Sequence, residues 1–135
     1  MSTSRGEADG AAIRGLLESW AEAVRAKDYS GILARHSADI LMFDLPPPME
    51  SKGIEAYRET WDLFFSAQPD PIDFDVQHMN VVAGEDVAFV TALMRCAERG
   101  TGGRRTVLEF RLTVGLRKVS GEWVVVHEHH SVPSA

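Results

Sequence analysis

The sequence has one cysteine, no excess of basic residues and no long apolar run, and each of these features excludes a class of protein. A single thiol, Cys96, cannot form a disulfide within the chain. The 14 Lys and Arg residues are outnumbered by 20 Asp and Glu residues, and the resulting net charge of -6 disfavours nucleic acids and anionic membranes as partners. No apolar run approaches the roughly 20 residues that a membrane-spanning helix needs.

Several motifs that carry particular chemistries are also missing. The chain has no Gly-rich phosphate loop, no nucleophile elbow and no paired cysteines. Residues 1–10 have no apolar segment of the kind found in secretion signals, so we expect a flexible tail there and a cytoplasmic protein. Residues 11–135 have the size of a single domain.

Two amphipathic helices are predicted in the first half of the chain. From 11 to 27, apolar residues recur at steps of three and four. A second stripe of this kind, which includes Tyr57 and Trp61, ends before Pro69. Between the two stripes, a short helix is expected over 32–36.

The second half of the chain is predicted to be mostly β-structure. A first strand over 40–45 precedes three consecutive prolines, and Gly residues separate the later apolar runs. These later strands are predicted over 72–82, 87–97, 106–119 and 123–132. The pattern indicates an α+β fold in which an antiparallel sheet wraps around the N-terminal helices. The helices would fill the concave side only in part, which leaves room for a ligand pocket.

Two stretches carry a resemblance to known families. The run Ser19-Trp20-Ala21-Glu22-Ala23-Val24, followed later by Ala38-Asp39-Ile40-Leu41-Met42-Phe43-Asp44, resembles the opening of ketosteroid isomerases and SnoaL-like polyketide cyclases. Both belong to the nuclear transport factor 2-like (NTF2-like) superfamily. The ending, with Trp123 and then His127-Glu128-His129-His130-Ser131-Val132-Pro133, is similar to the last strand of the calcium/calmodulin-dependent kinase association domain. The resemblance implies a cone-shaped, cystatin-like fold with a curved antiparallel sheet.

The resemblance to ketosteroid isomerases also implies roles for single residues. Asp44 falls where the isomerases have their catalytic base. Trp20 and Trp61 fall where they have two pocket tyrosines, and an indole is no replacement for an acidic phenol donor. The isomerases also keep a protonated aspartic acid on a later strand, whereas residues 112–115 contain no carboxylate. We therefore do not expect classical steroid isomerisation.

The residues themselves point to an acid–base site. Asp44 follows Met42 on one face of an apolar strand, where a buried carboxylate would suit general-base chemistry. Alternatively, Asp44 lies in water and caps the proline loop. In the last strand, alternation places His127 and His129 on one face and Glu128 and His130 on the other. Which of these faces lines the pocket stays open at this stage.

Arginines and histidines in the strands suggest further contacts. Arg95 and Arg111 interrupt apolar strands, and either could point inward to bind an anionic group or outward into solvent. The pair His127 and His129 lacks a third ligand at a metal-binding spacing, so we expect neither a metal nor a cofactor.

These observations together predict a protein that binds a small apolar carbonyl compound. Its chemistry would be of the isomerase, cyclase or dehydratase type, with Asp44, His129 and His130 as catalytic candidates. The candidate binding residues are Trp20, Met42, Tyr57, Trp61, Arg95, Arg111 and His127. The alternative is a non-catalytic ligand-binding or assembly module like the kinase association domain. In either case the long apolar strands leave an outer sheet face uncovered, which predicts a homodimer.

Overall fold

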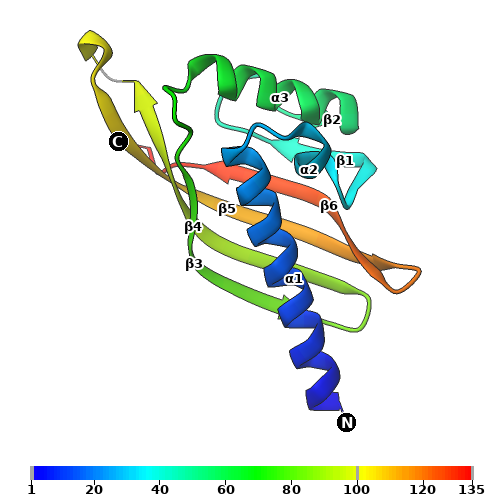
Figure 1. Cartoon of the computed structure of the whole chain (residues 1–135). Helices are drawn as coiled ribbons and strands as arrows, with labels where there is room; N and C mark the ends of the chain where they lie inside the picture. Colours follow the sequence, from blue (N-terminus) through cyan, green and yellow to red (C-terminus); the bar gives the residue numbers. More distant parts are fainter. Residues whose placement is uncertain (1, 100, 135) are drawn as a thin grey trace.

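The computed structural model describes residues 2–99 and 101–134 and contains three helices, a short 3-10 turn and six strands. In Figure 1, α1 lies along one face of the sheet and α3 lies across its upper end. The helices are α1 (Ser2–Arg25), α2 (Tyr29–Leu33) and α3 (Ile54–Ala67). The strands are β1 (His36–Phe43), β2 (Ser51–Lys52), β3 (Phe74–Ala83), β4 (Val87–Arg99), β5 (Arg105–Val119) and β6 (Glu122–Ser131).

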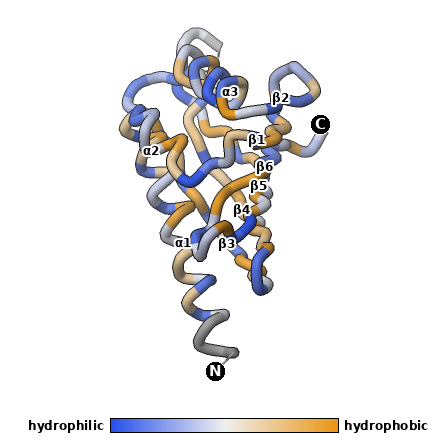
Figure 2. Tube along the Cα trace, turned by 90° about the vertical axis from the view of Figure 1, so that its right-hand side faces the viewer, coloured by the Kyte–Doolittle hydropathy of each residue, from blue (hydrophilic) through white to orange (hydrophobic). Residues whose placement is uncertain are grey.

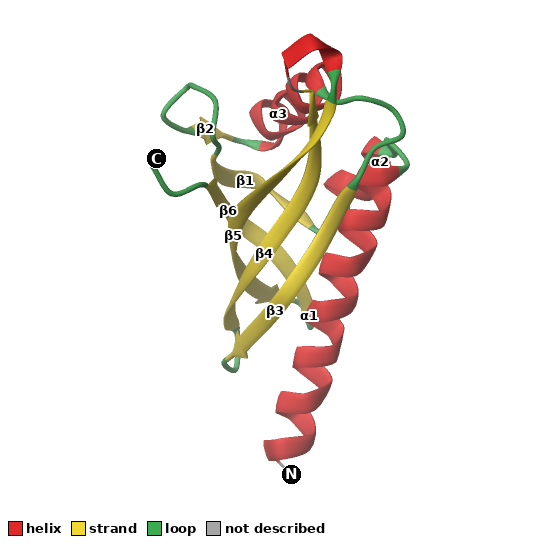
Figure 3. Cartoon of the chain, turned by 90° about the vertical axis from the view of Figure 1, so that its left-hand side faces the viewer, coloured by secondary structure: helices red, strands yellow, loops and turns green. Residues whose placement is uncertain are grey.

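The strands form one six-stranded sheet in the order β2-β1-β6-β5-β4-β3. The four long strands from β3 to β6 are antiparallel neighbours, as predicted, whereas β1 runs parallel to β6. Figure 3 shows that α1 follows the length of the curved sheet beside β3. The α+β fold class predicted from the sequence is therefore confirmed.

The inner face of the sheet, which we define as the face covered by α1 and α3, carries the core. The predicted stripe of α1 is buried there, with Ile13, Leu17 and Val24 at most 1% exposed. Each fully buried large apolar side chain contributes roughly 1.5–3 kcal/mol to folding. In Figure 2 the hydrophobic segments follow the strands, and hydrophilic segments mark turns at the ends of the sheet.

The first helix and the segment that follows it differ most from the sequence-based prediction. Helix α1 begins at Ser2, so the residues expected as a tail extend this helix, except Met1, which lies outside the described residues. Asp9 is largely buried and accepts a hydrogen bond from Trp123 on β6, a long-range partner that a local pattern does not reveal. The short helix α2 ends at Leu33, before the predicted range ends, and His36 begins β1 instead.

Two local features place His36 at the start of β1. Asp28 caps α2 by accepting the Gly31 N–H at 3.2 Å, so the short helix starts and ends early. Gly31 packs so closely on α1 that an added Cβ would lie 2.7 Å from the Cβ of Ala23. Arg35 then adopts a positive φ of 60°, which turns the chain from α2 into β1.

Among the described residues, no helix is long and apolar enough to span a membrane.

Candidate active site

A β-bulge in β6 decides which side chains of the last strand point inward. Gly115 of β5 pairs with His127, and the next residue, Leu116, pairs with Val125, so Val126 is an extra residue in β6. Such a bulge shifts the alternation of side chains by one position. Trp123 and Val125 are buried before the bulge, and Glu128 and His130 are buried after it. The inner face of β6 therefore carries a carboxylate and an imidazole.

Glu128 is 1% exposed and accepts three side-chain hydrogen bonds. Its Oε2 accepts from the Tyr57 hydroxyl at 2.7 Å and lies 2.9 Å from His36 Nε2. Its Oε1 lies 3.1 Å from His130 Nε2. Burial alone would raise the pKa of the Glu128 carboxyl, but the hydrogen bonds from His130 and His36 lower it to about 2. Glu128 is thus a buried carboxylate.

Tyr57 links this carboxylate to α1. Its hydroxyl oxygen accepts a hydrogen bond of 3.1 Å from Trp20 Nε1. Burial, and then the charge of Glu128, raise the pKa of the Tyr57 phenol well above its ordinary value, so the phenol stays protonated. The indole of Trp61 lies close enough to lower this pKa slightly, yet its Nε1 has no partner in hydrogen-bond geometry.

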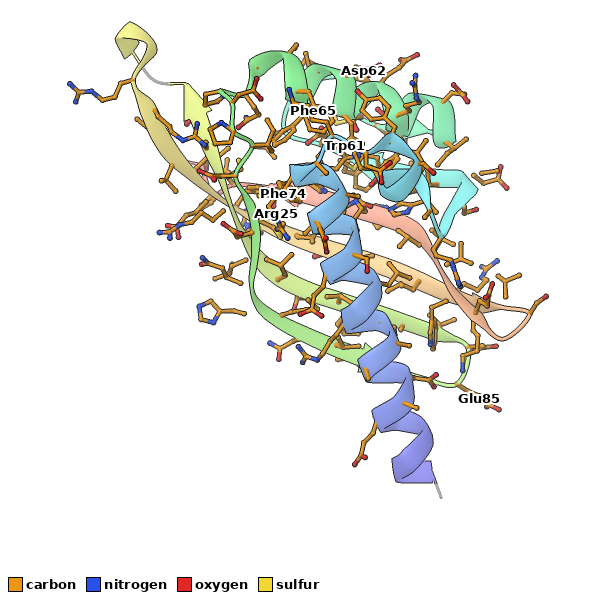
Figure 4. The ribbon with its side chains drawn as sticks, viewed as in Figure 1. Arg25, Trp61, Asp62, Phe65, Phe74 and Glu85 are labelled. Carbon is orange, nitrogen blue, oxygen red and sulfur yellow. The ribbon has the colours of Figure 1, made fainter. Side chains whose placement is uncertain are left out.

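Next to this cluster lies a partly open pocket of about 310 Å³ between α3 and the inner face of the sheet. The apolar side chains on its walls include Met42, Trp61, Phe64, Phe74, Leu108 and Phe110. Figure 4 shows Trp61 below α3 and Phe74 near the C-terminal end of α1. The polar side chains on its walls are Asp44, Thr60, Gln68 and His130. None of the described lining residues is Lys or Arg.

Asp44 and His130 meet at the polar end of this pocket. Asp44 follows directly after β1, and its Oδ1 lies 4.0 Å from Nδ1 of His130. The Asp44 side chain is 20% exposed, and Oδ1 also accepts the Leu45 N–H at 2.8 Å, so it holds the start of the proline loop as well. Asp44 therefore lines the pocket and also caps the start of the proline loop.

The His130 ring is fixed on several sides. Phe110 of β5 stacks on it with centroids 5.4 Å apart, and Trp20 and Trp61 meet its edge at 6.4 and 6.3 Å. Because Nε2 faces Glu128, the other ring nitrogen, Nδ1, is directed to the side where Asp44 lies. A proton could pass between a bound molecule and either group.

Two further polar atoms in the walls are left without partners. Trp61 Nε1 and Gln68 Oε1 are buried and make no hydrogen bond. A buried polar atom that lacks a partner costs about 1–3 kcal/mol, so a ligand or water that binds them would recover that cost. The Cys96 thiol also faces this pocket, and burial, followed by the charges of Glu98 and Asp73, raises its pKa to about 11.

Several residues predicted as site residues lie elsewhere. His127 and His129 point to the outer face of the sheet because the bulge reverses the alternation, and each packs against Phe43. Arg95 and Arg111 are exposed on the same outer face. Their place there follows from strand alternation, since their neighbours Met94, Cys96, Phe110 and Leu112 are buried.

Trp20 and Tyr57 do not line the pocket. Both are buried behind it, where they join the Glu128 cluster and pack against Trp61. Sequence reasoning missed Glu128 and His36 as site residues. The available signal was an ionisable residue in the middle of the apolar strand 123–132, which gains meaning only when the strand phase is known. Among the described residues, no group of three or more His, Cys, Asp or Glu side chains has an arrangement that could hold a metal ion.

Comparison with known proteins agrees with this fold. The model of the SnoaL-like domain matches residues 13–135. The chain belongs to the SnoaL-like domain family. No curated protein matches the sequence.

Solved structures of similar proteins support the same assignment. An NTF2-like protein of unknown function from Pseudomonas putida KT2440 is 34% identical over 100% of this chain and 91% of its own, with a TM-score of 0.81. A ketosteroid isomerase-like protein from Erwinia carotovora atroseptica is 20% identical over 93% of this chain and 96% of its own, with a TM-score of 0.76. The association domain of C. elegans CaMKII is 21% identical over 95% of this chain and 98% of its own, with a TM-score of 0.74. The resemblance inferred from the sequence is thus confirmed for family and fold.

Proposed function

We propose that this SnoaL-like protein is an acid–base enzyme that acts on a small, neutral carbonyl compound. The observation that carries the proposal is the 4.0 Å approach of Asp44 Oδ1 to His130 Nδ1 in the wall of a mostly apolar pocket. General acid–base catalysis needs such groups within reach of the same reacting atoms. The expected chemistry is an isomerisation, cyclisation or dehydration that begins with proton removal beside the carbonyl.

The charge around the pocket supports a neutral substrate. Asp44 lines the pocket and the buried Glu128 lies behind it, while no described lining residue is a cation. A ligand carboxylate would be repelled, because like charges in a medium of low polarity interact strongly. The arginines that could have bound an anionic group, Arg95 and Arg111, lie on the outer face, so we assign them no role in substrate binding.

Pocket size and polarity limit the substrate further. The pocket volume of about 310 Å³ is the volume that roughly ten water molecules occupy in liquid water. This size suits a compound of one or two rings. Flat aromatic walls from Phe74 and Phe110 favour a planar ring system. A second polar group on the substrate would satisfy the buried Gln68 amide.

In the proposed mechanism, Asp44 and His130 share one proton with the substrate. One of the two removes a proton beside the carbonyl group and holds it or passes it to the other, and the group that then carries this proton returns it at a new position or to a leaving hydroxyl. The aromatic walls exclude water and strengthen the interaction of both groups with the developing charge. Steroid isomerisation of the kind catalysed by ketosteroid isomerases is not expected, because Tyr57 donates its only hydroxyl proton to Glu128 and does not line the pocket.

Proton exchange tests the proposal without knowledge of the natural substrate. Neutral cyclic ketones such as 1-indanone are incubated with the protein in D₂O, and deuterium uptake beside the carbonyl is followed by NMR. We expect uptake above the buffer rate, and a reduction by about 10²–10⁴-fold in Asp44→Asn. The exposed variant Arg111→Gln serves as a control and should retain the full rate. Equal rates for Asp44→Asn and the unchanged protein would remove the catalytic role of Asp44.

The second candidate function is a non-catalytic ligand-binding or assembly module. It is favoured by the fold that the chain shares with the CaMKII association domain. The same assay separates the two candidates, because a ketone that binds, as measured by Trp61 fluorescence, but exchanges no proton would support a binding module.

We also propose that two copies of this chain pair through the outer sheet face. Large apolar side chains are exposed there, including Phe89 at 47%, Leu93 at 49% and Val107 at 60%. Exposed apolar groups of this extent are unfavourable in a lone domain. Sedimentation should give twice the chain mass of 14.9 kDa, and Leu93→Lys should shift the protein toward the monomer. A monomer at micromolar concentration would contradict the pairing.

A further inference from the structure

The cluster behind the pocket joins side chains from four elements around one buried carboxylate. His36 comes from the start of β1, Tyr57 from α3, Trp20 from α1, and Glu128 and His130 from β6. The side chains of His36 and Glu128 are both only 1% exposed. Each side chain of this cluster has a polar atom within hydrogen-bond distance of another. The hydrogen-bond geometry therefore determines which atoms carry the protons.

The proton of Tyr57 has one acceptor. The hydroxyl oxygen already accepts the indole N–H of Trp20, which can only donate. The hydroxyl proton therefore points to Glu128 Oε2 at 2.7 Å, in preference to His36 Nε2 at 3.2 Å. Glu128 accepts this hydrogen bond, and its carboxylate donates none.

Both ring nitrogens of His36 face acceptors. Nδ1 lies 2.8 Å from the carbonyl oxygen of Ala34, which can only accept, so Nδ1 carries a hydrogen. Nε2 lies 2.9 Å from Glu128 Oε2, and two lone pairs at this distance would repel each other. A proton must therefore lie between His36 and Glu128, and it lies on His36 because the further hydrogen bonds that Glu128 accepts from Tyr57 and His130 favour its ionised form. His36 is then an imidazolium that neutralises the buried carboxylate.

His130 is the remaining partner of Glu128. The carboxylate Oε1, at 3.1 Å, accepts from Nε2, so Nε2 carries a hydrogen. The charge of Glu128 is balanced by His36, and the other titratable group that faces His130 within the described residues is Asp44, from the end of β1. The aromatic neighbours Trp20, Trp61 and Phe110 carry no charge. With its hydrogen on Nε2, the neutral form of His130 has its lone pair on Nδ1, directed toward the side of Asp44.

We propose that Glu128, neutralised by His36, is a positioning residue that holds His130 in the Nε2–H tautomer and makes its Nδ1 the proton acceptor of the pocket. Glu128 does not touch the substrate and acts through His130. The catalytic meaning of this tautomer rests on the function proposed above, whereas the tautomer itself can be tested without any substrate.

The test is ¹⁵N NMR of the histidine rings in the uniformly labelled full-length protein at neutral pH. We expect His36 to carry hydrogens on both nitrogens, and His130 to carry one on Nε2 alone. Assignments come from His36→Gln and His130→Gln, and the exposed His129 serves as a reference ring outside the cluster. A wild-type His130 with its hydrogen on Nδ1, or a neutral His36, would overturn the proposal.

Replacing Glu128 by glutamine then tests whether Glu128 determines the tautomer of His130. In Glu128→Gln, the amide oxygen can still accept from Tyr57 and His36, which places the amide N–H₂ group next to His130 Nε2. We expect His130 to change to the Nδ1–H tautomer, because its Nε2 then faces an N–H donor. Glu109→Gln, on the exposed face of β5, should change neither ring. An unchanged His130 in a folded Glu128→Gln protein would contradict the proposal, and if that variant does not fold, the wild-type spectrum decides.

The exchange assay separates this inference from the proposed function. If the tautomer is as stated and 1-indanone exchanges protons, Glu128→Gln should lower the exchange rate by at least tenfold and alter its pH profile. If the tautomer is as stated but no ketone exchanges, the proposed function fails and the positioning of His130 by Glu128 stands.

Discussion

The two faces of β6 carry nearly the same residue types and differ completely in environment. On the inner face, Glu128 and His130 are buried and hydrogen-bonded to each other. On the outer face, His127 and His129 pack against Phe43, and His127 Nδ1 meets the backbone oxygen of Leu41 at 2.7 Å. The inner pair lies in a network of hydrogen bonds, and its His130 faces a pocket, whereas the outer pair borders an exposed sheet surface.

One extra residue produces this difference. Without the bulge at Val126, the alternation that buries Trp123 and Val125 would also bury His127 and His129. The comparison shows that the chemistry of a strand depends on which of its residues point inward as much as on which residues it contains. The predictions below test the contrast between the faces, beginning with the largest expected effect.

Loss of the inner carboxylate should destabilise the protein far more than loss of an outer histidine. In Glu128→Ala, the His36 imidazolium is left buried without a counter-charge, and breaking such a pair typically costs about 3–5 kcal/mol. His129→Ala, on the outer face, should change the free energy of unfolding by at most about 0.5 kcal/mol. Urea denaturation measures both, and equal effects would show that the two faces do not differ as described.

Acid should weaken the inner face selectively. The pKa of Glu128 is about 2 in the folded protein against an ordinary 4.5, so its ionisation stabilises the fold at any pH above about 4.5. This stabilisation, about 3 kcal/mol, should be lost progressively as the pH falls from about 4.5 to about 2. Urea denaturation between about pH 6 and pH 3 should show the loss. Glu128→Gln, which cannot titrate, should show a clearly smaller loss, and an identical pH dependence would argue against the lowered pKa.

Removal of a single hydroxyl sharpens the comparison further. Tyr57→Phe deletes the donor to Glu128 and the acceptor of Trp20, and hydrogen bonds to charged groups contribute about 1.5–3 kcal/mol. On the outer face, Thr113→Val removes a hydroxyl from the residue that pairs with His129, and we expect a change within about 0.5 kcal/mol. Thermal or urea unfolding of the two variants measures both losses of stability. A greater loss of stability in Thr113→Val than in Tyr57→Phe would contradict this prediction.

Much of the fold could be predicted from the sequence because it depends on local periodicity. The apolar stripes of α1 and α3 and the β-rich second half are visible as patterns of period 3.6 and 2. The start of β1 was missed because it depends on the positive φ of Arg35, which is a feature of a single residue. The start of α1 was placed too late, since the partners of Asp9 lie more than 100 residues away.

The candidate site could be predicted only in part. Asp44, Met42, Trp61 and His130 line the pocket, and all four were identified from the apolar strand around Asp44, the superfamily resemblance and the histidine cluster. The choice between His129 and His130 could not be made, because it depends on a bulge of one residue that leaves no local signature. Glu128 and His36 lie 92 positions apart and acquire a role only through their contact in the fold.

The most direct test of the whole account compares the two neighbouring histidines of β6 in the exchange assay. His130→Gln and His129→Gln change the same residue type at adjacent positions that face opposite sides of the sheet. We predict that deuterium uptake by 1-indanone falls by about 10²–10⁴-fold in His130→Gln and is unchanged in His129→Gln. An equal rate in both variants, or a loss confined to His129→Gln, would contradict the assignment of the inner face as the active site.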